Sequence, residues 1–89
     1  VKLTVDKNYL VPIQDSGLVV FIGEKDGYGN TVIIQQMDGI DTWYGGLGAI
    51  HVKLYDYVEE GSLLGEVVDN SLYLVYKKEG TLLDYQEHI

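Results

Sequence analysis

Short apolar runs alternate with turn residues along the whole chain. Residues 31–34 form an apolar, β-branched run, Asp38 and Gly39 follow shortly after it, and residues 40–44 return as a second run. An Asp-Gly pair between two such runs predicts a β-hairpin with a two-residue turn, in which both turn residues take positive φ. We expect the rest of the chain to be organised around this hairpin.

Every other predicted element is also a strand. Period-two patterns, or β-branched and aromatic runs between turn signals, predict strands at residues 3–5, 10–13, 17–24, 50–54, 63–68, 71–76 and 81–83. The run 17–24 is apolar on both faces, which indicates a central strand that is either buried on both sides or crosses a sandwich core. Pro12 places strand 10–13 at a sheet edge or at a strand start, because proline has no amide hydrogen.

No window of about eleven residues or more carries an apolar stripe of helical period, so the only helix expected is a turn near residues 85–88. A further turn is expected at residues 79–80. Short strands separated by turn signals predict an all-β fold in which two sheets form a sandwich or barrel-like body. The 89 residues are enough for one domain, spanning 1–89.

Charge and composition exclude several partners. The chain has six lysines, no arginine, fourteen acidic residues and a net charge of −8. Without arginine it lacks bidentate phosphate contacts, so we exclude nucleic acid as a partner and expect no direct binding to anionic membranes. No apolar run approaches the roughly 20 residues that cross a bilayer. Because the chain starts at Val1 in a strand-like pattern, we expect it to be a fragment of a longer protein.

Side chains that carry out catalysis are few. There is no cysteine, and none of the three serines lies in a nucleophile elbow. His51 lies between Ile50 and Val52, which predicts a solvent-facing strand residue, and His88 is next to the last residue. Two unrelated histidines give no recognisable zinc-ligand spacing.

Aromatic residues are unusually frequent, with eight tyrosines, one tryptophan and one phenylalanine. Such side chains suit either the margins of a small core or the energetic centre of an interface. Strand packing is the alternative, because sheets favour aromatic residues. We expect at least two members of the following set to contact a partner: Tyr55, Tyr57, Tyr73 and Tyr76.

The order of several motifs resembles that of the LytM-type zinc endopeptidases of peptidase family M23. The resemblance covers nearly the whole chain and includes Val11-Pro12-Ile13, Gly27-Tyr28-Gly29-Asn30-Thr31, Thr42-Trp43-Tyr44-Gly45-Gly46-Leu47 and Val58-Glu59-Glu60-Gly61. It implies the two-sheet β architecture of that family, the duplicated hybrid motif. This agrees with the fold class predicted from the pattern.

In active members of that family, zinc is held by a His-x-x-x-Asp motif and by the second His of a His-x-His motif, and two further His assist catalysis. By resemblance, the Asp position falls on Lys2, a catalytic His falls on Gly46, and the His-x-His positions fall on Ser71 and Tyr73. The first His would precede Val1. A cation at Lys2 repels a metal. The resemblance therefore implies a domain that is no enzyme and holds no cofactor.

Among such degenerate members, segments 43–47 and 52–61 are most similar to the stage IV sporulation protein FA group of endospore-forming bacteria. That likeness implies a LytM domain of a membrane-anchored protein, whose anchor in the outer forespore membrane lies outside this chain. The domain would project into the space between the mother-cell and forespore membranes and regulate pro-sigma-K processing. Implied partners are the intramembrane metalloprotease stage IV sporulation protein FB, the bypass-of-forespore protein and the signalling proteases.

Two alternatives stay open at this point. One is a scaffold similar to stage II sporulation protein Q, which also belongs to the degenerate LytM proteins. The other, less favoured, is a lipoyl or biotinyl carrier domain, since residues 58–65 have a similar glycine spacing. A carrier needs a lysine at a hairpin tip beside methionine, whereas Asp38 follows Met37 and Lys25 has no methionine neighbour.

The residues at the lost ligand positions predict a partner-binding surface. Tyr73 occupies a ligand position, and Trp43 and Tyr44 are close to Gly46 in sequence. Amphipathic rings around small residues are typical of an interface hot spot. The alternative is that Tyr73 fills the space left by the metal and packs into the core.

Overall fold

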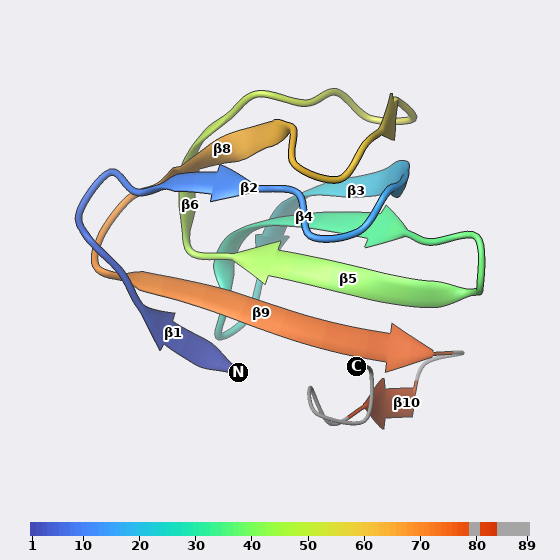
Figure 1. The fold of residues 1–89 in the computed structure, drawn as a ribbon. Helices are drawn as coiled ribbons and strands as arrows, with labels where there is room; N and C mark the ends of the chain where they lie inside the picture. The colour runs from blue at the N-terminus through green and yellow to red at the C-terminus, as the bar shows by residue number, and fades with distance from the viewer. Residues whose placement is uncertain (79–80, 84–89) are drawn as a thin grey trace.

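The chain folds into short strands connected by tight turns (Figure 1). The computed structural model describes residues 1–78 and 81–83. In chain order, the strands are β1 (Lys2–Thr4), β2 (Leu10–Pro12), β3 (Gly17–Lys25), β4 (Gly29–Gln35), β5 (Ile40–Gly45), β6 (Leu47–Ile50), β7 (Tyr57–Val58), β8 (Leu63–Val67), β9 (Ser71–Lys78) and β10 (Thr81–Leu83). These residues contain no helix, and hence none that could span a membrane. The predicted turns at 79–80 and 85–88, and His88, lie outside the described residues.

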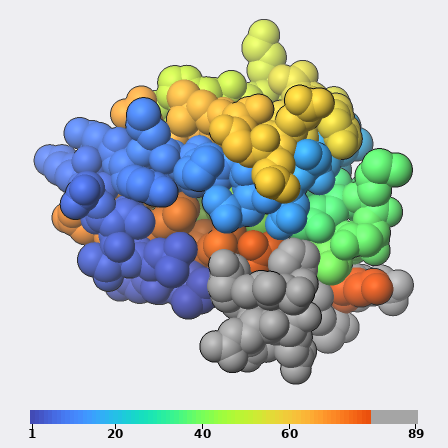
Figure 2. All heavy atoms as spheres, viewed as in Figure 1, coloured from blue at the N-terminus to red at the C-terminus, as the bar shows by residue number. Residues whose placement is uncertain are grey.

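The strands form two antiparallel sheets, which confirms the predicted fold class. The larger, seven-stranded sheet has the order β1-β9-β5-β4-β3-β7, and β10 also pairs with β9. The smaller sheet has the order β2-β8-β6. In the space-filling view, the blue and yellow segments around β2 and β8 cover the upper part of the larger sheet (Figure 2).

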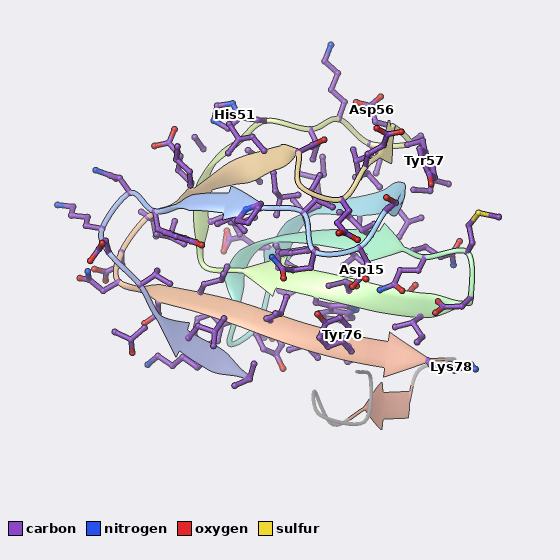
Figure 3. The ribbon with its side chains drawn as sticks, in the orientation of Figure 1. Asp15, His51, Asp56, Tyr57, Tyr76 and Lys78 are labelled. Carbon is purple, nitrogen blue, oxygen red and sulfur yellow. The ribbon has the colours of Figure 1, made fainter. Side chains whose placement is uncertain are left out.

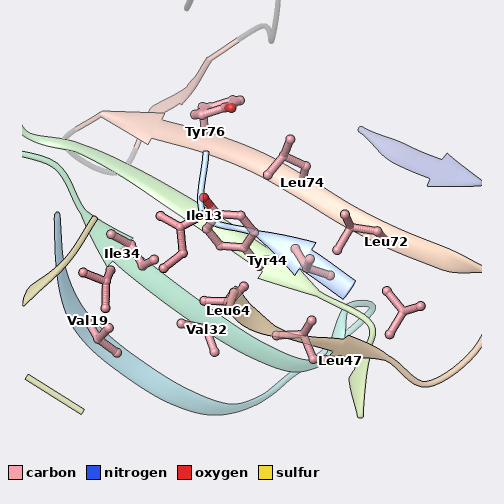
Figure 4. Close-up of a cluster of buried hydrophobic side chains, with 13 residues drawn as sticks. Ile13, Val19, Val32, Ile34, Tyr44, Leu47, Leu64, Leu72, Leu74 and Tyr76 are labelled. Atoms are coloured by element: carbon pink, nitrogen blue, oxygen red, sulfur yellow. The ribbon is translucent and has the colours of Figure 1, made fainter. Parts of the chain in front are cut away.

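The hydrophobic core fills the space between the two sheets (Figure 4). The larger sheet contributes Val19, Val32, Ile34, Tyr44, Leu72, Leu74 and Tyr76, and the smaller sheet contributes Val11, Leu47, Leu64 and Val67. Side chains alternate between the faces of a strand. Residues 73, 75 and 77 of β9 therefore point away from this core, on the face that we call the outer face.

The polar tip of Tyr44 is satisfied inside the core. Its hydroxyl oxygen accepts a hydrogen bond from the backbone N–H of Gln14 at 2.9 Å. Burial raises the pKa of Tyr44, so the hydroxyl stays neutral. A buried ring whose hydroxyl is paired in this way fixes the segment after β2 against β5.

The central hairpin of β4 and β5 forms as predicted, but its turn is longer. The N–H of Gly39 donates to the carbonyl of Gln36 at 3.0 Å, and the N–H of Gln36 donates to the carbonyl of Ile40 at 2.8 Å. Gly39 has a φ of 86°, and Asp38 is not among the residues with positive φ. The connection is thus a three-residue loop closed by a glycine bulge, in which only one residue needs positive φ. The Asp38 carboxylate accepts from the N–H of Ile40 at 3.0 Å.

The strand predicted at 17–24 forms as β3, but the prediction that it is buried on both sides is wrong. β3 pairs with β4 along its length, but on its other edge it pairs with β7 only at Gly17 and Leu18. Leu18 is 37% exposed, and Phe21 and Ile22 are half-buried. One face of β3 packs on the core and the other belongs to the outer face, so the doubly apolar pattern does not mark a second covering sheet.

The predicted strand at 50–54 is also wrong. β6 ends at Ile50, and the chain then makes a turn in which the N–H of Asp56 donates to the carbonyl of Lys53 at 3.1 Å. The Asp56 carboxylate accepts from the N–H of Lys53 at 3.2 Å, which offers the backbone an alternative to a strand ladder. By contrast, Pro12 lies on the edge strand β2, as predicted.

Candidate functional site

The four positions that the family resemblance aligns with ligands and catalytic histidines lie around one hollow. Its volume is about 350 Å³, and its lining includes Lys2, Gly46, Ser71 and Tyr73. Lys2 of β1 and Tyr73 of β9 are register partners, and Gly46 lies between β5 and β6. The β3–β4 turn completes the lining with Gly27, Tyr28 and Gly29, and the β8–β9 turn contributes Val68 and Asp69.

Gly46 occupies a backbone position that admits no side chain without displacement. Its φ is 81°, and a Cβ atom there would lie 2.7 Å from the carbonyl oxygen of Ser71 and 3.4 Å from the Tyr73 ring. Its N–H donates to the carbonyl of Tyr28 at 2.6 Å. This close packing of the Tyr28 turn against the β5–β6 junction requires glycine.

Aromatic and cationic groups gather at the edge of the hollow. The rings of Tyr28 and Tyr73 meet edge to face, with centroids 5.8 Å apart. The Lys2 ammonium lies 5.9 Å from the Tyr73 ring centroid. Asp69 is the one carboxylate in the described lining. Within the described residues, no three His, Cys, Asp or Glu side chains are grouped so that they could hold a metal ion.

The hollow continues into a second aromatic group on the outer face, around Trp43 of β5. The Tyr28 ring also meets the Trp43 ring edge to face, at a centroid distance of 6.0 Å. Trp43 is in register with Ile33 of β4 and Val75 of β9, both buried. The outer face thus carries its own small apolar cluster, separate from the main core.

Candidate partner-contacting residues fall into three different environments. Tyr44 is 0% exposed and Tyr76 is 3% exposed, so both are core residues and were wrongly predicted as partner contacts. Figure 3 shows Tyr76 on β9, far from Tyr57. Tyr55 and Tyr57 are 70% and 58% exposed, but neither lines the hollow. Trp43 and Tyr73 are half-buried and share the outer face.

His51 takes no part in the hollow. It is exposed, as predicted, but lies after the end of β6 rather than on a strand (Figure 3). Its Nε2 is 3.4 Å from a carboxylate oxygen of Glu66. Sequence reasoning missed Tyr28, whose position between two glycines in a turn was the available signal, and Lys77, which the period of β9 places on the face of Tyr73.

The fold is that of a known peptidase family. The family model described as "Peptidase family M23" matches residues 1–86. The chain therefore belongs to peptidase family M23. This assignment removes the carrier-domain alternative. No curated protein matches the chain significantly in sequence.

Solved structures of this family share the fold at low sequence identity. The antimicrobial peptidase lysostaphin from Staphylococcus simulans is 23% identical with a TM-score of 0.85, over 98% of this chain and 41% of its own. Csd3 from Helicobacter pylori is 22% identical with a TM-score of 0.88, over 99% and 25% of the two chains. A chain of the SpoIIIAH–SpoIIQ complex is 22% identical with a TM-score of 0.79, over 93% and 64%. The chain thus spans less than half of lysostaphin.

Proposed function

We propose that this M23 domain is catalytically inactive and serves as a protein-interaction domain. The observation that supports the proposal is that Lys2, Gly46, Ser71 and Tyr73 line one hollow. The family resemblance aligns these four residues with zinc ligands and catalytic histidines. Lysine and glycine supply no metal ligand here, and a protonated lysine repels a cation. Gly46 also has no room for an imidazole.

The interaction role is supported by what replaces the lost ligands. Tyr73, Tyr28 and Trp43 form a continuous row of edge-to-face rings from the hollow onto the outer face. Partly exposed tyrosine and tryptophan side chains are the residue types that dominate binding energy in protein interfaces. A similar fold also occurs in the SpoIIIAH–SpoIIQ complex, an assembly of two proteins.

On the family resemblance, we further propose that the parent protein resembles stage IV sporulation protein FA. It would be anchored in the outer forespore membrane, with this domain in the space between the mother-cell and forespore membranes. There it would hold stage IV sporulation protein FB and the bypass-of-forespore protein in an inhibited complex, which signalling proteases release for pro-sigma-K processing. A scaffold similar to stage II sporulation protein Q is the second candidate, favoured by the SpoIIIAH–SpoIIQ likeness.

Co-purification of the parent membrane protein tests this proposal. Wild-type protein should retain stage IV sporulation protein FB and the bypass-of-forespore protein, and Tyr73→Ala should lose them while the isolated domain still melts cooperatively. Tyr9→Ala is the matched control, because Tyr9 is a half-exposed tyrosine that does not line the hollow. Destabilisation of Tyr73→Ala with unchanged partner retention would show that Tyr73 serves only packing.

A further inference from the structure

Three of the six lysines hold their ammonium groups over aromatic rings of the outer face and its hollow. Lys77 lies 3.9 Å from the centroid of the Trp43 ring, and Lys25 lies 5.2 Å from the same ring and 4.4 Å from that of Phe21. Lys2 lies over Tyr73 at 5.9 Å. Lysine stems can cover apolar surface in this way while their ammonium groups stay accessible to water.

None of these lysines is paired with a carboxylate. Among the described residues, the only ion pair joins His51 and Glu66. This is notable in a chain with fourteen acidic residues and a net charge of −8. The outer face around Trp43 therefore carries two lysines, Lys25 and Lys77, whose ammonium groups lie over rings. It also carries one carboxylate, that of Asp41, which is the register partner of Lys77 but forms no ion pair with it.

The same face holds two polar atoms without a hydrogen-bond partner. The indole Nε1 of Trp43 and the Oδ1 of Asp41 are buried and unpaired in the described structure. The two residues are two positions apart on β5, so both side chains point to the outer face. Native proteins leave few such atoms unpaired, and pairing with a bound partner is one physical reason for such an exception.

We propose that the outer face around Trp43 binds an extended, acidic segment of a partner protein. Carboxylates of that segment pair with Lys25 and Lys77 on either side of the indole. An extended peptide presents alternate side chains to one side about 6.6 Å apart, and its backbone carries both donors and acceptors. Pairing of its backbone with Trp43 Nε1 and Asp41 Oδ1 requires the neighbouring side chains to shift on binding, because both atoms are buried in the free domain.

This assignment rests on the proposed function as an interaction domain and names the partner chemistry. Carboxylates fit the site better than nucleic acid phosphates do. The face carries point-charge lysines without arginine, and the net charge of −8 opposes a polyanion over any longer distance. A short acidic segment contacts Lys25 and Lys77 directly. Because it is shorter than a nucleic acid strand, fewer of its charges are repelled by the acidic surface around the site.

The test uses the whole chain and a defined probe, the fluorescein-labelled peptide Glu-Val-Glu-Val-Glu with blocked ends. Binding is followed by fluorescence anisotropy and by the emission of Trp43, the single tryptophan of the chain. The double variant Lys25→Gln/Lys77→Gln should weaken binding about tenfold or more, because it removes both of the lysine–carboxylate pairs that the proposal assigns to the complex. Lys53→Gln is the matched control, because Lys53 is exposed on the β6–β7 connection.

Wild-type chain should bind this peptide and not its Gln-Val-Gln-Val-Gln analogue. Equal binding of the two peptides, equal loss in Lys53→Gln, or no response of Trp43 emission would overturn the proposal. Tighter binding of a single-stranded DNA oligonucleotide than of the acidic peptide would overturn it as well. Partner co-purification and zinc content test the proposed function by other readouts, so failure here refutes only the acidic-segment assignment.

Discussion

Replacing Gly46 with histidine introduces the side chain that the proposed family alignment assigns to this position, at a point where the backbone has no space for it. The residue has a φ of 81°, and a Cβ atom would lie 2.7 Å from the Ser71 carbonyl oxygen. Real Cβ atoms do not approach backbone oxygen so closely, so β9 or the β5–β6 junction must move. The domain should fold less stably with this histidine than without it.

The magnitude follows from two separable terms. A non-glycine residue at positive φ costs about 1 kcal/mol. Forcing a side chain into an occupied site costs about 1–3 kcal/mol more. The sum, about 2–4 kcal/mol, is a large fraction of the stability of a small domain. For a chain of this size it corresponds to a fall in melting temperature of at least about 8 °C.

Thermal melts and urea unfolding of three variants separate these terms. Gly27→Ala is the matched control, because Gly27 has a φ of 85° and nothing lies within 4 Å of an added Cβ. It should lose only the conformational term, Gly46→Ala should lose more, and Gly46→His should lose the most. If Gly46→His does not fold, the stability of Gly46→Ala can still be compared with that of Gly27→Ala. Gly46→Ala as stable as Gly27→Ala would refute the steric reasoning.

Two further predictions concern the fold and the outer face. Gly39→Val should lower the free energy of unfolding by more than about 1 kcal/mol, because the bulge requires a φ of 86°, and an unchanged melting midpoint would contradict the turn geometry. Burial raises the pKa of Asp41 above its usual 3.8, and a carboxyl with a raised folded-state pKa loses stability as the pH rises through that window. The stability of Asp41→Asn relative to wild type, measured by urea unfolding, should therefore increase as the pH rises above 3.8, and a difference that does not change with pH would contradict this reasoning.

The hairpin could be predicted from sequence because its signals are local. β-branched runs of strand length flank a short turn segment, and nothing distant is needed to pair them. The turn length could not be predicted, because it depends on the register of Gln36 with Ile40, which an Asp-Gly pair alone does not set. The error about the burial of strand 17–24 has a similar origin. An apolar pattern shows that a strand face is covered, but it does not show whether a second sheet covers it or only lysine stems and neighbouring rings do.

The candidate site was partly accessible to sequence reasoning. Lys2, Gly46, Ser71 and Tyr73 lie around one hollow because β1 and β9 pair in the register that brings Lys2 opposite Tyr73. The two-residue period of β5 is enough to place Tyr44 on the core face. The family resemblance instead led to the prediction that Tyr44 contacts a partner. The convergence of Lys25 and Lys77 on one indole depends on β3, β5 and β9 being assembled, which no local pattern encodes.

Zinc content after metal loading tests the central claim most directly. The purified chain is incubated with excess zinc, dialysed and analysed for metal, alongside a zinc-dependent M23 peptidase prepared in the same way. The account predicts far less than one zinc per chain, because the proposed alignment puts Lys2 at a ligand position and Gly46 at a catalytic position. It also predicts no cleavage of glycyl peptides or peptidoglycan. Stoichiometric zinc, or hydrolysis of either substrate, would contradict it.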